Sequence, residues 1–146
     1  MISLSFPLSL ISLSFVISDF DLNFKEFADY SVPPSQPVIT TNASTLSNLR
    51  EYDVITLTCS SLGGNPAPSL TWYRGGVALG GATYAGPGVK YGNTTSGLVW
   101  TLGAGDDGAG FVCVAQNAAT AGTAGVSSNT LRLAVQCECL IVVFFI

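Results

Sequence analysis

Residues 54–60 read Val-Ile-Thr-Leu-Thr-Cys-Ser, and their larger hydrophobic side chains recur at every second position. This period of two is typical of a β-strand with one face in a core, because successive side chains of a strand point to opposite sides. The residues on the inward face are Ile55, Leu57 and Cys59. Residues 111–115 repeat the pattern, and their inward face consists of Phe111, Cys113 and Ala115. Each of these two strands therefore carries one cysteine towards the core.

Short runs rich in β-branched and aromatic residues follow one another from residue 33 to residue 135, and turn-forming residues interrupt them about every ten positions. The further runs are residues 38–40, 69–74, 77–79, 98–102 and 126–135. We expect a turn at Gly63-Gly64-Asn65-Pro66 and a loose glycine-rich passage over residues 80–92. No hydrophobic run keeps the spacing of three and four residues that a helix of three turns requires. The sequence predicts an all-β, two-sheet antiparallel sandwich.

Trp72 shares a strand face with Leu70 and supplies a large side chain to the same core. Two cysteines that face one core from opposite sheets can be joined where the sheets approach to roughly 6 Å between Cα atoms. We therefore expect a disulfide between Cys59 and Cys113, with Trp72 packed against it. Such a bond removes roughly 4 kcal/mol of chain entropy from the unfolded state. The alternative is a pair of reduced, buried thiols in an intracellular protein.

The pattern of Cys59, Trp72 and the segment Asp107-Gly108-Ala109-Gly110-Phe111-Val112-Cys113 resembles an immunoglobulin-like domain, over about residues 33–135. The segment Gly64-Asn65-Pro66-Ala67-Pro68 is similar to the C2- and I-set domains of nectin-, nephrin- and other adhesion-receptor ectodomains. The resemblance implies a Greek-key sandwich with an inter-sheet disulfide, in which Trp72 is a core marker.

Phe111 stands where this family usually has a tyrosine, two residues before the second cysteine. Its ring can still fill the core, so Phe111 is expected to be a second core marker that lacks the hydroxyl bond of the family. In family members the acid at the place of Asp107 often pairs with a base. Lys90 or Arg50 is the candidate here, and an exposed Asp107 is the alternative.

The composition limits the possible functions. Charged residues make up 10% of the 146 residues, the net charge is −4, and histidine is absent. Intrinsic disorder and a basic nucleic-acid-binding surface are excluded, as are catalytic triads that use imidazole and most zinc and haem sites. The neighbouring carboxylates of Asp106 and Asp107 should point apart, which makes them a poor acid/base couple. We expect no enzyme, no cofactor, no metal and no small-molecule substrate.

The chain divides into four segments by composition. Residues 32–136 are expected to form the domain, because they contain all 16 glycines and carry balanced charges. Residues 1–18 are a possible signal peptide, with a non-native flank as the alternative, and residues 19–31 are an acidic flank. Residues 137–146 form an apolar tail, either a truncated membrane segment or an artefact. The expected location is extracellular, in the ectodomain of a membrane protein or in a secreted protein, and the membrane would be reached only through segments missing from this chain.

Two N-glycosylation sequons lie within the domain, Asn42-Ala43-Ser44 and Asn93-Thr94-Thr95. Both are in stretches expected to be loops or strand edges, so Asn42 and Asn93 are the expected glycan acceptors of a secreted chain.

Tyr73, Val112 and Val114 are expected to point outward from two neighbouring strands, with Arg74 at the margin of the patch. Aromatic and arginine side chains in such a patch concentrate binding energy. The expected function is a cell-surface adhesion or recognition module whose partner is another protein, either a receptor or a second copy of the chain. The alternative is a secreted, soluble immune-type recognition protein that uses the loop of residues 118–128.

Overall fold

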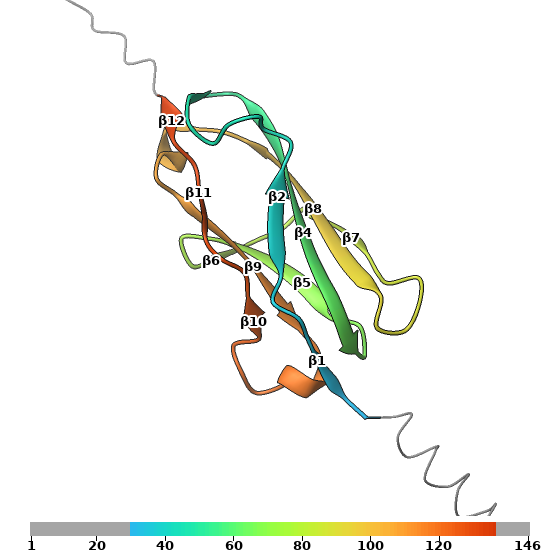
Figure 1. The fold of residues 1–146 in the computed structure, drawn as a ribbon. Helices are drawn as coiled ribbons and strands as arrows, with labels where there is room; N and C mark the ends of the chain where they lie inside the picture. Colours follow the sequence, from blue (N-terminus) through green and yellow to red (C-terminus); the bar gives the residue numbers. More distant parts are fainter. Residues whose placement is uncertain (1–29, 137–146) are drawn as a thin grey trace, which may run out of the picture. The chain divides into compact units, whose positions relative to one another are not determined.

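The computed structural model describes residues 30–136, which include two facing β-sheets (Figure 1). The strands of the first sheet are β1 (Val32–Pro34), β2 (Val38–Thr41), β4 (Val54–Asn65), β7 (Thr83–Ala85) and β8 (Asn93–Thr101). Their order is β1-β4-β8-β7, and β2 also pairs with β4. Every pairing in this sheet is antiparallel. The predicted signal peptide, the acidic residues 19–29 and the tail at 137–146 lie outside the described residues.

The second sheet faces the first across the core. Its strands are β5 (Ser69–Arg74), β6 (Val77–Leu79), β9 (Gly110–Gln116), β10 (Val126–Ser127) and β11 (Leu131–Arg132). Their order is β10-β9-β5-β6, with β11 also on β9, and all pairings are antiparallel. A short parallel pair joins β3 (Leu49–Arg50) to β12 (Val135–Gln136), and two 3-10 turns complete the fold, η1 (Ala104–Asp106) and η2 (Ala118–Thr120). The predicted all-β, immunoglobulin-like sandwich is confirmed.

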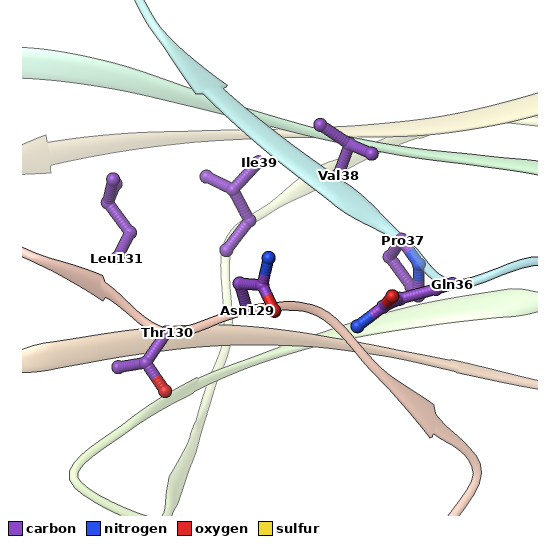
Figure 2. A pocket seen from close by; sticks show the side chains of 7 residues that line it. All are labelled: Gln36, Pro37, Val38, Ile39, Asn129, Thr130 and Leu131. Atoms are coloured by element: carbon purple, nitrogen blue, oxygen red, sulfur yellow. The ribbon is translucent and has the colours of Figure 1, made fainter.

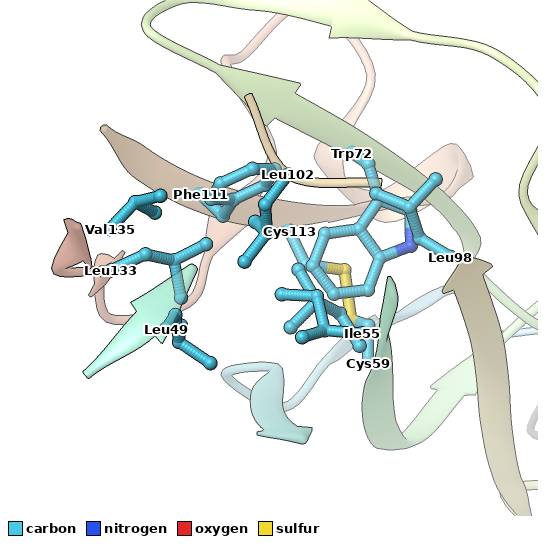
Figure 3. Close-up of a cluster of buried hydrophobic side chains, with 11 residues drawn as sticks. Leu49, Ile55, Cys59, Trp72, Leu98, Leu102, Phe111, Cys113, Leu133 and Val135 are labelled. Atoms are coloured by element: carbon cyan, nitrogen blue, oxygen red, sulfur yellow. A yellow bond between two sulfur atoms is a disulfide. The ribbon is translucent and has the colours of Figure 1, made fainter. Parts of the chain in front are cut away.

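The centre of the core joins the two sheets covalently. A disulfide links Cys59 of β4 to Cys113 of β9, with 6.3 Å between the Cα atoms, as expected from the inward phase of both strands. Trp72 of β5 is 1% exposed and lies beside the disulfide (Figure 3). Its indole Nε1 donates a hydrogen bond of 3.1 Å to Oγ of Ser96 on β8. The covalent bond and this buried polar bond therefore both span the two sheets.

A second group of contacts closes one end of the sandwich around Asp106. The Asp106 carboxylate is buried, and its Oδ1 accepts from Nε of Arg74 on β5 at 2.5 Å. Its Oδ2 accepts from Nε1 of Trp100 on β8 at 3.2 Å and from the Gly103 N–H at 2.8 Å. The Trp100 ring packs edge to face against Phe111, which is fully buried. One carboxylate thus connects a strand of each sheet.

The ion pair at this end uses Asp106 and not Asp107. For Asp107 a pairing with Lys90 or Arg50 and an exposed side chain were both left open, and the second alternative holds: the residue is exposed and its Oδ1 accepts from the Val135 N–H at 3.1 Å. The two neighbouring aspartates do point apart, and the first of them turns inward because the 3-10 turn η1 ends there. Asp106 pairs with Arg74 in this protein.

Three expectations about loops and strand ends are wrong in detail. The expected turn at Gly63–Pro66 is partly strand, because β4 continues through Gly63 and Gly64, whose φ angles are +75° and +87°. The glycine-rich passage of residues 80–92 contains β7, which is held by bonds between Thr83 Oγ1 and the Gly97 backbone. The expected strand 126–135 is broken between β10 and β11, where the Ser128 hydroxyl accepts from the Cys113 N–H. Each departure depends on a partner from a distant segment.

Removal of the Asp106 carboxylate should destabilise the domain much more than removal of its neighbour. Asp106→Ala leaves the Arg74 Nε–H, the Trp100 Nε1–H and the Gly103 N–H without their acceptor, and we expect a loss of about 2–4 kcal/mol. Asp107→Ala removes one acceptor at an exposed site and should cost about 1 kcal/mol or less. Urea unfolding of the two variants measures both values, and equal losses would contradict the role given to Asp106.

The buried hydroxyl groups of Ser96 and Thr94 on β8 allow a second comparison of two variants. Ser96→Ala removes the acceptor of the Trp72 indole N–H, and we expect a loss of about 1–3 kcal/mol. Thr94 Oγ1 is buried without a hydrogen-bond partner among the described residues, so Thr94→Val should leave the stability unchanged or raise it by about 1 kcal/mol. Urea unfolding measures the stability of both variants, and the prediction is wrong if Thr94→Val lowers the free energy of unfolding more than Ser96→Ala does.

Candidate protein-binding face

The outer face of the second sheet presents three partly exposed side chains close together. Tyr73 of β5 lies directly opposite Val112 of β9, and Val114 follows two positions along β9. Their neighbours Trp72, Phe111, Cys113 and Ala115 are all buried. Because side chains alternate along a strand, this inward set directs Tyr73, Val112 and Val114 to the outside. The structure therefore places these three residues on one face, as their phase predicts.

These side chains line a shallow groove of about 600 Å³. Three residues of its lining are glycines, which have no side chain to fill the groove. The full lining is Tyr73, Gly75, Gly76, Gly110, Val112, Val114, Ala124, Ser127, Thr130 and Arg132. A β-carbon on Gly110 would lie 2.7 Å from Cγ2 of Thr130, so the groove floor has room only for glycine there unless Thr130 moves. The groove lining combines apolar side chains with a few polar groups, as the surfaces that bind proteins do.

Arg74 does not line this groove. Arg74 lies on the same side of β5 as Trp72, whereas Tyr73 lies on the other side. Its guanidinium donates hydrogen bonds to the Asp106 carboxylate and to the Gly105 carbonyl oxygen. The structure thus gives Arg74 a place at the end of the sandwich, and its part at the margin of a binding patch stays a prediction. Its charge is held by a buried carboxylate and is not available in full to a partner.

Arg132 on β11 supplies the cation of the groove instead, and the sequence analysis missed it. It lies opposite Gly110 in the β11–β9 register, and its Nη1 donates to the Gly108 carbonyl oxygen at 2.9 Å. Leu131 and Leu133 on either side are more buried, so alternation within residues 126–135 already indicated that Arg132 points outward. What the alternation could not show is that β11 pairs with the strand of Val112.

The loop after β9 is held by its own hydrogen bonds. The Asn117 side chain accepts from the Ala119 N–H and donates to the carbonyl oxygens of Val32 and Pro66, both at 2.8 Å. The Asn117 N–H donates to Thr120 Oγ1. Asn117 thus ties the start of the 118–128 loop to β1 and to Pro66, just after β4, so this part of the loop has less freedom to adapt to a partner.

A smaller hollow lies at the seam between β2 and β11 (Figure 2). It measures about 160 Å³ and is lined by Gln36, Pro37, Val38, Ile39, Asn129, Thr130 and Leu131. Gln36 Nε2 donates to the Ser127 carbonyl oxygen beside it, at 3.3 Å. Ile39 and Leu131 are both partly buried against the core, so this hollow is a gap in the closure of the sandwich.

Residues 30–136 contain neither a metal-binding cluster nor a membrane-spanning helix. Within that range no group of three or more His, Cys, Asp or Glu side chains is placed to hold a metal ion. The same range contains no helix with the length and hydrophobicity needed to cross a bilayer. The expected glycan acceptors are exposed and belong to the first sheet: Asn42 follows β2, and Asn93 begins β8.

The sequence and fold are similar to those of adhesion proteins. Human cell adhesion molecule 3 is 37% identical over 83 residues, which are 55% of this chain and 20% of that protein. Human Kin of IRRE-like protein 3 is 37% identical over 95 residues, which are 62% of this chain and 12% of that protein. The solved ectodomain of mouse nectin-like molecule 4 has a TM-score of 0.60 at 26% identity, over 73% of this chain and 35% of that one.

The chain thus spans a fifth or less of the length of these two curated relatives. One of them is a cell adhesion molecule by name, and the predictions of a non-enzymatic protein with an extracellular location agree with that relative. Residues 37–124 match the family profile of the CD80-like C2-set immunoglobulin domain, and the chain belongs to this family.

Proposed function

We propose that this domain is an adhesion or recognition module that binds another protein through the groove of the second sheet. The observation that carries the proposal is the groove itself, whose lining includes Tyr73, Val112 and Val114 together with Arg132. Tyrosine and arginine contribute large contact areas and directed hydrogen bonds, so they dominate the energy of many protein interfaces. The kinship with cell adhesion molecules supports the same role.

The charges of the domain permit a second copy of the chain as the partner. Between residues 32 and 136 the bases Arg50, Arg74, Lys90 and Arg132 balance the acids Glu51, Asp53, Asp106 and Asp107. A domain without net charge meets no overall repulsion from its own copy. Arg132 is the one charged residue of the groove lining, so a different receptor with a carboxylate at its binding surface is the other partner that fits this chemistry.

A charge at the centre of the groove should weaken association. Tyr73→Glu places a carboxylate where the partner must exclude water, and we expect the dissociation constant of self-association to rise by about tenfold or more. The matched control is Val99→Glu, which adds the same charge to an exposed position on the outer face of the first sheet and should leave association unchanged. Sedimentation equilibrium of the secreted protein measures association, and circular dichroism verifies that each variant folds.

The outcomes separate the versions of the proposal. A wild-type protein that stays monomeric at high concentration excludes the homophilic version and leaves a second receptor as the partner. Equal weakening by Tyr73→Glu and Val99→Glu would show that the groove is not the interface. Unfolding of Tyr73→Glu would contradict the outward placement of Tyr73.

A further inference from the structure

The first sheet contains no charged residue in any of its strands. The sequences of β1, β2, β4, β7 and β8 lack Asp, Glu, Lys and Arg throughout. Its outer face consists of threonine, serine, glycine, asparagine and aliphatic side chains. Four of these aliphatic side chains are strongly exposed, between 59% and 67%: Val38, Val54, Leu62 and Val99. Most soluble sheets protect such a face with charges or with a covering element, because an uncharged β-surface associates readily.

The two glycosylation sequons lie at opposite ends of this face. Asn93 is the first residue of β8 and is directly opposite Leu62 near the end of β4. Asn42 follows the last residue of β2, and its N–H and Oδ1 both bond to the backbone of Thr56, near the start of β4. Thr56 and Leu62 are six residues apart on one strand, so the two asparagines are separated by roughly 20 Å along the sheet. Sequence separation gave no indication of this arrangement.

Both side chains are placed to accept a sugar. Asn42 and Asn93 are exposed, and the Asn42 amide is held through its oxygen by the Thr56 N–H at 2.7 Å. The nitrogen of the same amide is the atom that an N-linked glycan uses. In the reaction Nδ2 bonds to the anomeric carbon of a lipid-linked oligosaccharide, the bond from that carbon to the lipid pyrophosphate breaks, and Nδ2 gives up one proton.

We propose that N-linked glycans on Asn42 and Asn93 cover the outer face of the first sheet from its two ends. The glycans supply the polar surface that the strands lack, and they shield Leu62 and Val99 from contact with other proteins. The groove of the second sheet lies on the other face of the sandwich and stays open. The last statement rests on the proposed function, whereas glycan attachment and shielding do not.

The first test is occupancy, measured on the full chain directed into the secretory pathway of a eukaryotic cell. Ser44→Ala and Thr95→Ala remove the two sequons without changing either asparagine, whereas Ser44→Thr and Thr95→Ser keep them. Intact mass before and after peptide-N-glycosidase treatment should show two glycans on the wild type and on both retaining variants. It should show one glycan on each removing variant and none on the double variant. A wild type with fewer than two glycans overturns the proposal.

The second test is shielding, measured by hydroxyl-radical labelling of the wild type and of the Ser44→Ala, Thr95→Ala double variant. Labelling of Leu62 and Val99 should rise about twofold or more when the glycans are absent, while labelling of Tyr73 stays the same. Unchanged labelling of Leu62 and Val99 overturns the shielding even if both glycans are present. Circular dichroism verifies that the double variant keeps its fold.

Self-association separates this proposal from the proposed function. If the double variant gains association that Val99→Glu suppresses and Tyr73→Glu does not, the first sheet is an adhesive face that the glycans cover. If Val99→Glu suppresses association of the fully glycosylated wild type, the first sheet is open and the shielding is overturned. Failure of Tyr73→Glu to weaken association refutes the groove alone and leaves the glycan measurements as they stand.

Discussion

The disulfide between Cys59 and Cys113 is the constraint from which the other features of the domain follow. It joins an inner strand of one sheet to an inner strand of the other, and the Trp72 indole lies beside it with a hydrogen bond to Ser96 on the facing sheet. Because both cysteines must point inward, every second residue of β4 and β9 is committed to the core. The residues between them are committed to the surface in the same way. The outward positions of Val112 and Val114 are thus a consequence of the bond at Cys113.

The two sheets have opposite surface chemistry although they share one core. The outer face of the second sheet has a groove whose lining includes a tyrosine, three glycines and Arg132. The outer face of the first sheet is uncharged, and its strands β4 and β8 present threonine and aliphatic side chains there. A groove provides both a concave surface and a directed polar group, which a specific partner requires. An uncharged sheet face provides neither, and in our proposal glycans on Asn42 and Asn93 supply the polarity that this face lacks.

Asp106 shows how a polar group can hold an apolar sandwich together. Its carboxylate receives hydrogen bonds from the side chains of Arg74 on the second sheet and Trp100 on the first. A buried carboxylate is tolerated only when its acceptor positions are filled, and here the Gly103 N–H fills another. Arg74 is consequently drawn to the end of the sandwich. Tyr73, the residue before it, points to the opposite face of β5, because successive side chains of a strand alternate.

The amino-acid sequence was sufficient for the fold class, the inward phase of the main strands, the disulfide and the outward phase of Tyr73, Val112 and Val114. These properties depend on alternation within one strand, which is local, or on the few residues that must occupy a sandwich core. The Asp106 ion pair, the strand at 83–85, the break at Ser128 and the place of Arg132 beside Val112 were settled by the folded chain. Each depends on which loop brings two distant segments together, and that choice is made by packing and hydrogen-bond geometry that no local pattern encodes.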